Sequence, residues 1–393
     1  MTAASRANVD SFIVMEVMNQ AAKLEKAGHS IIHMEVGQPG TSAPQPARKA
    51  AAEALGQDPL GYTVAAGLPE LRQRIAQHYA NQYGVNVDAE RIIVTTGSSA
   101  GFVLTFLAVF EAGTKVGLPV PGYPCYRQIL KALGQTEVPI RTDAASRWMP
   151  TVEAIAQAKA EHDIAGVLIA SPANPTGTML SPERLDDICQ YCRVNGLWFI
   201  SDEIYHGLTY GRDAVTALGN SNTTANENVV IINSFSKYFS MTGWRIGWVV
   251  VPTQLIGTFE RLQQNLYISP PTISQVAALA AFDGTEELEA NRSVYAHNRE
   301  ILLQGLKDTG FSKSVPADGA FYLYCDVSDW CSDSLALSTQ VLHEAHVAIT
   351  PGIDFDKHEG HRYVRFSYAR STADIEKGIL RLQHWWASQT ART

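Results

Sequence analysis

The sequence has no hydrophobic run long enough to cross a membrane. Its apolar N-terminal stretch, residues 12–18, is short, is interrupted by Glu16, and has neither a basic leader nor a small-residue cleavage site. A membrane-spanning helix needs roughly 20 apolar residues. Cysteine is also scarce, because five are scattered through 393 residues, an odd number that suits reduced thiols better than a disulfide framework. These absences predict a cytoplasmic protein that is neither secreted nor inserted in a membrane.

An excess of positive charge is missing as well. The 31 lysine and arginine residues are outnumbered by 39 aspartate and glutamate residues, which gives a net charge of −8. No basic face is therefore expected to bind nucleic acid, and an anionic ligand must be held by a local site. Hydrophobic residues make up 46% of the chain, which is enough for a globular fold. The length favours at least two packed parts.

Short apolar runs alternate with helical patterns through the middle of the chain, as a doubly wound α/β sheet requires. The helix pattern is clear where Leu71, Ile75 and Tyr79 share one face behind Pro69, since proline is favoured at the first helical position. Most of the apolar runs are continuous, as in buried parallel strands. The predicted strands are residues 92–94, 115–119, 166–170, 197–201, 229–233 and 246–251.

Beyond about residue 282 the pattern changes to a long polar helix, a short strand at residues 319–325 and two further helices. This change indicates a second, smaller domain of the α+β type. We therefore expect a large sheet domain over residues 47–290 and a small domain formed by residues 1–46 and 291–393.

Three predicted strands end close to side chains that can do chemistry. Lys237 follows strand 229–233, Asp202 follows strand 197–201, and Asn174 lies shortly after strand 166–170. Open α/β sheets bind ligands in the crevice at the carboxyl ends of their strands. We therefore expect these three residues to share one site, although each of them taken singly could have a structural role.

The order of these residues resembles the class I and II aminotransferases, a fold-type I family of enzymes that use pyridoxal 5′-phosphate (PLP). The resemblance covers nearly the whole chain, and no single motif would carry it. The motifs are residues 62–67 with Leu71-Arg72, Gly97-Ser98-Ser99, Tyr123-Pro124, residues 171–177, 202–205, 234–247 and 319–322, Pro351-Gly352, and Arg365-Phe366-Ser367. It implies the PLP-dependent transferase fold type I, with a large, mixed but mostly parallel sheet. It also implies an aminotransferase that moves an amino group from an L-amino acid to a 2-oxo acid.

By this resemblance Lys237 carries PLP as a Schiff base and moves a proton between the substrate Cα and the cofactor. A lysine amine suits both tasks, since it can bind an aldehyde and act as a base. Asp202 matches the carboxylate that keeps the pyridine nitrogen of PLP protonated. Tyr205 and Asn174 match the donors to the phenolic oxygen of the ring. Lys237, Asp202 and Tyr205 are therefore the expected catalytic residues.

The family holds the cofactor phosphate with an arginine, serines and a helix N-terminus whose free N–H groups point at the anion. The matching residues are Arg245, Ser234, Ser98 and Ser99, and Ser236 is a further candidate. Tyr123 takes the place of the aromatic residue that stacks on the ring. Tyr62 takes the place of a tyrosine that reaches the phosphate of the other subunit, which implies a homodimer.

The substrate α-carboxylate calls for a planar bidentate donor, which lysine imitates poorly. Arg365 matches the family's carboxylate arginine, Gly37 matches a backbone contact to the same carboxylate, and Asn174 is expected to contact the substrate as well as the cofactor.

A second carboxylate on the substrate has no matching partner. Arg261 lies too far before Pro270-Pro271 for the family's dicarboxylate clamp, and Gly97 is followed by serine where another branch of the family has lysine. A buried carboxylate without a partner is costly. We therefore expect neutral, apolar or aromatic amino acids, or alanine, to be used at least as well as aspartate, unless a residue such as Arg6 supplies the charge.

Two alternatives share the lysine motif. One is another PLP reaction, that of a C–S β-lyase or a ring-forming synthase. The other, more remote, is the effector domain of a PLP-sensing transcription regulator, although no basic extension precedes residue 11. No metal is expected, because Cys189 and Cys192 lie on an apolar helix face and His343 and His346 lack the i, i+4 spacing of a helical zinc site.

Overall fold

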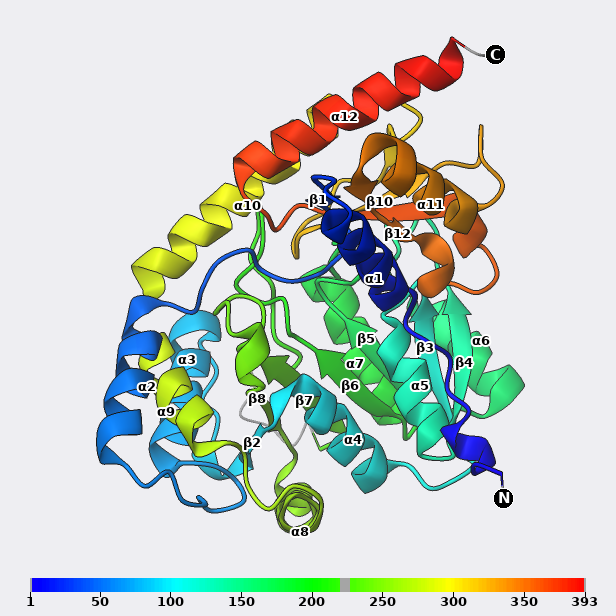
Figure 1. The fold of residues 1–393 in the computed structure, drawn as a ribbon. Coiled ribbons are helices and arrows are strands. Elements are labelled where there is room, and N and C mark those ends of the chain that lie inside the picture. The colour runs from blue at the N-terminus through cyan, green and yellow to red at the C-terminus, as the bar shows by residue number, and fades with distance from the viewer. Residues whose placement is uncertain (1, 220–226, 392–393) are drawn as a thin grey trace.

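The computed structural model describes residues 2–219 and 227–391, and a seven-stranded sheet forms its centre (Figure 1). The strands lie in the order β2-β8-β7-β6-β5-β3-β4. They are β2 (Ile92–Thr95), β3 (Lys115–Val120), β4 (Thr136–Arg141), β5 (Gly166–Ala170), β6 (Trp198–Asp202), β7 (Val229–Ser234) and β8 (Gly247–Val250). Strand β8 runs antiparallel to both of its neighbours, and the other paired strands are parallel. The sheet is therefore mixed and mostly parallel, which confirms the predicted fold class.

The six predicted strands agree with the observed ones to within one residue at each end. Strand β4 is missing from the prediction. It lies at the edge of the sheet, and its burial alternates, so that Val138 and Ile140 are buried while Thr136 and Arg141 are exposed. A short, half-exposed strand has a weak sequence signal, because it lacks the continuous apolar run of a central parallel strand.

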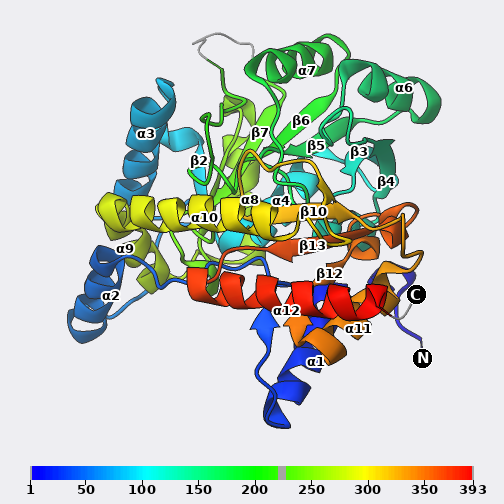
Figure 2. The same cartoon turned by 90° about the horizontal axis from the view of Figure 1, so that it is seen from above.

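Helices cover both faces of the sheet (Figure 2). Successive residues of a strand point to opposite faces, so Val167 and Ile169 of β5 pack with α6 and α7, whereas Leu168 packs with α4, α5 and α8. The helices of this part are α2 (Gln45–Gln57), α3 (Pro69–Tyr83), α4 (Gly97–Val109), α5 (Pro124–Ala132), α6 (Val152–His162), α7 (Pro182–Val194), α8 (Ile256–Leu266) and α9 (Thr272–Ala281). The sheet therefore lies between two apolar cores.

Two local predictions concern these helices, and the first is confirmed: helix α3 begins with Pro69 and buries Leu71, Ile75 and Tyr79. The second is confirmed in part, because helix α7 carries Cys189 and Cys192 as free thiols, but only Cys192 is buried and Cys189 is partly exposed. Burial raises the pKa of the Cys192 thiol to about 12, so this group stays protonated and inert.

The second part of the chain contains a four-stranded sheet in the order β12-β13-β10-β9. Its elements are α10 (Thr285–Gly305), β9 (Lys313–Ser314), β10 (Tyr322–Asp326), α11 (Ser334–Ala345), β12 (Thr350–Pro351), β13 (Tyr363–Ser367) and α12 (Thr372–Thr390). The N-terminal segment, with α1 (Ile13–Lys26) and β1 (Ile32–His33), joins this part, since β1 pairs with β11 (Val347–Ala348). The long polar helix and the two final helices agree with the prediction, and the predicted strand 319–325 corresponds to β10, which begins three residues later. The expected boundary at residue 290 falls within α10.

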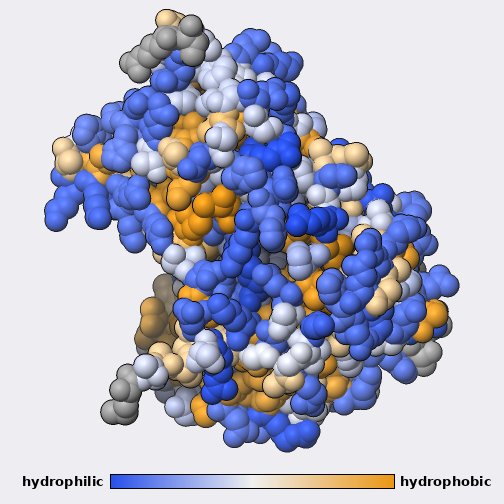
Figure 3. Space-filling view, turned by 90° about the vertical axis from the view of Figure 1, so that its right-hand side faces the viewer, coloured by the Kyte–Doolittle hydropathy of each residue, from blue (hydrophilic) through white to orange (hydrophobic). Residues whose placement is uncertain are grey.

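Figure 3 shows one face of the molecule on which hydrophilic side chains surround scattered hydrophobic residues. Among the helices of the described residues, none combines the length and the apolar character that crossing a membrane requires.

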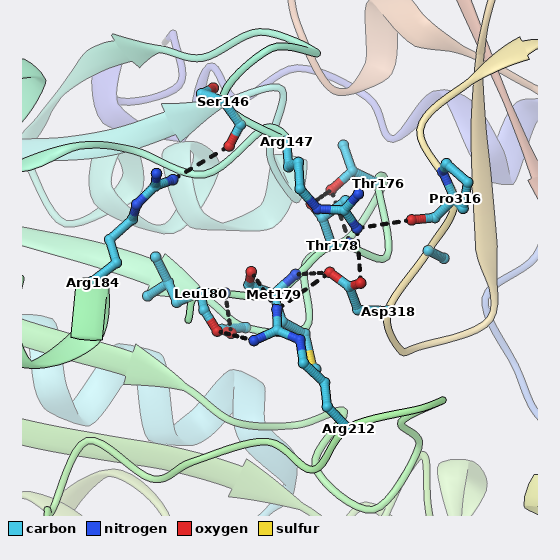
Figure 4. Close-up of polar contacts among 12 residues, drawn as sticks. Ser146, Arg147, Thr176, Thr178, Met179, Leu180, Arg184, Arg212, Pro316 and Asp318 are labelled. Carbon is cyan, nitrogen blue, oxygen red and sulfur yellow. Dashed lines mark hydrogen bonds and ion pairs between the residues drawn. The ribbon is translucent and has the colours of Figure 1, made fainter. Parts of the chain in front are cut away.

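Asp318, in the loop before β10, connects the second part to the large sheet (Figure 4). Its carboxylate accepts hydrogen bonds from Arg147 Nη2 at 2.7 Å, from the Met179 N–H at 3.1 Å and from Arg212 Nη2 at 3.4 Å. Its own N–H donates to the Gly177 carbonyl at 2.8 Å. Asp318 is 20% exposed, while the side chains of Arg147 and Arg212 are 44% and 38% exposed. The carboxylate is therefore the best shielded member of this cluster.

We expect Asp318→Ala to lower the free energy of unfolding by about 1–2 kcal/mol, because it removes a charged acceptor from a backbone N–H and an arginine. Arg147→Ala and Arg212→Ala should each cost less than about 1 kcal/mol, since exposed ion pairs contribute little. Urea unfolding followed by circular dichroism measures all three values. If the Asp318 variant were as stable as either arginine variant, the Asp318 carboxylate would contribute no more to stability than each arginine does, and the prediction would be wrong.

Candidate active site

Lys237 lies in the turn that follows β7, among groups that withdraw its amine from water. Its Nζ donates a hydrogen bond to the Gly37 carbonyl at 2.6 Å and lies 5.7 Å from the centre of the Tyr205 ring. Burial lowers the pKa of Lys237 to about 8, two nearby arginines lower it too, and Asp202 opposes the change. A lysine of this kind has a larger neutral fraction near neutral pH than an ordinary lysine, and the neutral amine is the form needed by a nucleophile or a base.

Asp202 is the last residue of β6 and is buried at the same edge of the sheet. Its Oδ1 accepts a hydrogen bond from the Ile204 N–H at 3.0 Å, and its Oδ2 accepts one from the Tyr126 hydroxyl group. Burial raises the pKa of Asp202 to about 6, while both hydrogen bonds and the charge of Lys237 oppose the rise. The carboxylate is therefore mainly ionised at neutral pH and is set to face a cationic group.

The sequence analysis overlooks Tyr126. It lies on α5, three positions after Tyr123, the residue that immediately precedes this helix. Residues three apart at a helix lie on the same side. Their rings are 5.3 Å apart at an interplanar angle of 79°. The i, i+3 spacing could have identified Tyr126 as a neighbour of the site, but nothing in the sequence indicates that its hydroxyl group contacts Asp202.

Arg365, in β13, is a buried guanidinium that is 2% exposed. Its Nη1 donates to Asn174 Oδ1 at 2.7 Å, and its Nη2 donates to the Glu35 carbonyl and, at 3.2 Å, to Thr350 Oγ1. In the described part of the chain its buried Nε has no hydrogen-bond partner, and its guanidinium forms no ion pair with a carboxylate. A buried cation with a spare donor fits a carboxylate ligand.

Tyr205 follows β6 and is buried beside Arg365 and Lys237. Its hydroxyl group shares a hydrogen bond of 2.7 Å with the hydroxyl group of Tyr322. A Cβ atom on Gly37 would lie 1.8 Å from the same Tyr322 oxygen, so a residue with a side chain could not occupy position 37. The structure thus brings the predicted Lys237, Asp202, Tyr205, Asn174, Arg365 and Gly37 together through direct contacts or shared neighbours.

The predicted phosphate contacts gather at the first turn of α4. A Cβ atom on Gly97 would lie 2.5 Å from Arg245 Nη2, so the guanidinium lies directly against this helix end. The side chain before the helix does not cap it, which leaves its first N–H groups for an anion. Ser98 is partly exposed and Ser99 is exposed.

The two serines of the turn after β7 differ in their hydrogen bonds. Ser234 Oγ lies 2.8 Å from Ser236 Oγ and 3.1 Å from the Ile246 carbonyl, and its one hydrogen can be donated to either oxygen. Its single hydrogen is therefore used inside the loop. Ser236 Oγ is one of these two acceptors, and among the described residues no hydrogen bond uses its own hydrogen, which stays free for another acceptor. This arrangement favours Ser236 over Ser234 as a direct donor to a ligand.

The two remaining predicted residues are aromatic. Tyr123 precedes α5, is partly buried, and packs edge-on against Phe12 with 6.0 Å between the ring centres. Tyr62 is 86% exposed, and within the described residues it has no hydrogen bond or ring contact with the other predicted site residues. Tyr123 therefore belongs to the wall of the site, whereas Tyr62 is exposed and makes no such contact with the site of its own chain.

The fold and the site together define an α/β enzyme with a sequestered lysine and arginine at the carboxyl edge of its sheet, and comparison with known proteins gives the family. Residues 29–382 match the family described as aminotransferase class I and II. A valine–pyruvate aminotransferase of Mycobacterium tuberculosis is 45% identical over 98% of this chain and 99% of the relative.

Solved structures agree with this match. An aminotransferase structure from Mycobacterium tuberculosis has a TM-score of 0.95 and 45% identity, and covers 99% of this chain and 100% of that one. Aspartate aminotransferase of Thermus thermophilus with maleate has a TM-score of 0.90 and 30% identity, and covers 97% of this chain and 99% of that one.

The chain belongs to the class I and II aminotransferase family. It is a transaminase, an enzyme that moves an amino group between an amino acid and a 2-oxo acid. Its family uses PLP as the cofactor. These findings confirm the family and the reaction predicted from the sequence. They favour transamination over the lyase, synthase and regulator alternatives.

Proposed function

We propose that this aminotransferase holds PLP on Lys237 and binds the carboxylate of its amino acid at Arg365. The observation that carries the proposal is a pair of basic groups shielded from water, neither of which forms an ion pair with a carboxylate of the described residues. A buried charge without a counter-ion is costly. Such a pair is therefore expected where a ligand completes the site, with an aldehyde at the amine and a carboxylate at the guanidinium.

The side chains around Lys237 fit the functional groups of PLP. Asp202 offers a carboxylate to the ring nitrogen, Tyr205 and Asn174 offer donors to the phenolic oxygen, and Tyr123 offers an aromatic face. The phosphate would be held by Arg245, Ser98, Ser99, Ser234 and Ser236 together with the first N–H groups of α4. These assignments give every polar group of the cofactor at least one partner.

When bound, PLP supplies an electron-accepting ring and a carbon that takes the amino group. The neutral amine of Lys237 would take the proton from the substrate Cα and later return it to the acceptor carbon. Asp202, as an anion, would keep a proton on the ring nitrogen. Arg365, with Asn174 on its Nη1, would fix the carboxylate and so orient the Cα–H bond toward Lys237.

A single-turnover experiment tests this function. We expect the protein, incubated with an amino acid and no oxo-acid acceptor, to release one equivalent of 2-oxo acid per bound PLP and then stop. Addition of pyruvate should restart turnover. Continuous release of ammonia without an acceptor would instead indicate a β-elimination reaction and would contradict the proposal.

We further propose that two copies form a homodimer in which Tyr62 reaches the phosphate site of the other subunit. Tyr62 is exposed, and its loop is anchored to α9, because Thr272 Oγ1 donates to the Gly61 carbonyl at 2.5 Å. We also propose that the chain divides into a large domain of residues 47–290 and a small domain of residues 1–46 and 291–393. The proposed location of the protein is the cytoplasm. Sedimentation of the PLP-loaded protein tests the dimer.

The same site leads to a prediction about substrates. Phe12 packs edge-on against Tyr123 and so adds an apolar side chain next to this residue of the site, and a relative with 45% identity is a valine–pyruvate aminotransferase. We expect kcat/KM for valine, leucine, phenylalanine or alanine to equal or exceed that for aspartate. An advantage of about a hundredfold for aspartate, about 2.7 kcal/mol, would contradict this.

Such a result would direct attention to Arg127. It lies on α5, four positions after Tyr123, and its buried Nε has no hydrogen-bond partner within residues 2–219 and 227–391. Arg127→Leu would then remove the preference for aspartate if this residue were the missing partner of a second carboxylate. Steady-state kinetics with the four apolar or small donors and aspartate, all against pyruvate, measure both effects.

A further inference from the structure

We propose that Tyr322 is a positioning residue that serves both ends of the site: its hydroxyl group orients Tyr205, and its ring holds Arg365 in place for the substrate carboxylate. The inference rests on the proposed functions of Tyr205 and Arg365. It gives a role to the last residue of the 319–322 motif.

The ring of Tyr322 supports the guanidinium of Arg365. Tyr322 begins β10 and is 1% exposed, and β10 pairs with the strand that carries Arg365. The Arg365 Cζ lies over the Tyr322 ring, 4.4 Å from its centre, and over the Phe355 ring, 4.8 Å from its centre. Planar guanidinium groups stack well on aromatic faces. The two rings therefore limit rotation of a cation that must meet a planar carboxylate.

The hydroxyl group of Tyr322 lies where three proposed active-site groups meet. It is 2.7 Å from the Tyr205 hydroxyl oxygen and so close to Gly37 that no Cβ fits there. The carbonyl of Gly37 in turn accepts from Lys237 Nζ. In the described chain the only acceptor in reach of the Tyr322 hydrogen is the Tyr205 oxygen. This arrangement couples the orientation of Tyr205 to Tyr322.

The number of hydroxyl hydrogens determines which tyrosine is the donor when Tyr205 binds a ligand. Each hydroxyl group has one hydrogen. If Tyr205 donates to a ligand oxygen, the bond between the two tyrosines persists only with Tyr322 as the donor. Donation from Tyr322 polarises the Tyr205 O–H bond and strengthens it as a donor. Without Tyr322, Tyr205 would stabilise negative charge on the phenolic oxygen of the cofactor less well.

Tyr322→Phe tests the hydroxyl group, because it keeps the ring below Arg365 and the space beside Gly37. In PLP-loaded protein, visible absorbance should titrate with pH as the Lys237–cofactor linkage loses its proton. We expect the midpoint to rise by roughly half a pH unit or more, the scale for weakening one hydrogen bond near a charge. We also expect kcat to fall about three- to tenfold, with little change in KM for the amino acid.

Tyr322→Leu tests the ring. It should additionally raise KM for the amino acid about tenfold, because the guanidinium loses its stacking partner. Inhibition by 3-methylbutanoate, a carboxylate without an amino group, should weaken by a similar factor. Tyr324→Phe is the matched control: Tyr324 lies in the same strand, and its buried hydroxyl group has no hydrogen-bond partner among the residues that the structure describes. Its titration midpoint and its KM should both equal those of the wild type.

The Tyr322→Phe variant decides the proposal, since Tyr322→Leu also removes volume from the core. A midpoint and a kcat equal to those of the wild type would overturn the role of the hydroxyl group. An unchanged inhibition constant in a folded Tyr322→Leu protein would overturn the role of the ring. If the wild-type protein itself showed no visible band, the proposed function would fail instead, so the two failures are distinguishable.

Discussion

Replacing Lys237 with alanine is expected to lower transamination by about 10⁴-fold or more, because two contributions are lost together. The variant lacks the amine that holds the cofactor covalently, and it lacks the base placed to move the Cα proton. Arg365 and Asp202 remain, so binding of the amino acid and of PLP without a covalent bond should persist. The yellow colour of the purified protein should be lost, since its visible band depends on the bond between the Lys237 amine and the cofactor.

The control for this experiment is Lys159→Ala. Lys159 lies on α6 and pairs with Asp163 at 2.6 Å, so its removal should leave both absorbance and turnover unchanged. Absorbance spectra and single-turnover rates at matched PLP content are the measurements. A Lys237→Ala variant with near wild-type turnover would refute the assignment of this residue.

Asp202→Asn is expected to lower turnover by about 10²–10⁴-fold, the usual range for charge and proton-transfer groups in active sites. The amide keeps the shape of the side chain but removes the negative charge that would keep the ring nitrogen of PLP protonated. The ring would then accept electrons less well. The loss should therefore appear in removal of the Cα proton, measured as a larger isotope effect with α-deuterated substrate.

Glu203, the next residue, provides a matched control. Its Oε1 accepts from Thr216 Oγ1 at 3.0 Å and from the Ala217 N–H at 2.9 Å, away from the contacts of Asp202. Burial raises the pKa of Glu203 to about 8, so this carboxyl group is mainly neutral at neutral pH. Glu203→Gln should therefore keep turnover near that of the wild type. If Asp202→Asn kept its kcat at normal PLP occupancy, the role of Asp202 would be wrong.

Much of the site could be predicted because its residues directly follow buried strands. The apolar runs that became β6 and β7 end at Asp202 and shortly before Lys237, and the sheet brings these ends together as expected. The prediction failed at β4, where alternating burial at the sheet edge weakens the pattern. It also left out Tyr126, whose ring is predictable from its helix position but whose contact with Asp202 is not.

The sequence by itself determined the element order, the strand ends and the residue types that they carry, because these depend on periodicity and turn chemistry among neighbouring residues. Only the tertiary structure decided the partners. Tyr126 meets Asp202 across 76 positions, Tyr205 meets Tyr322 across 117, and Asn174 meets Arg365 across 191. Such contacts depend on how strands from both sheets and the intervening loops pack, and on which buried polar groups must satisfy one another. No local pattern encodes that choice, since each of these side chains has several acceptable partners until packing leaves it one.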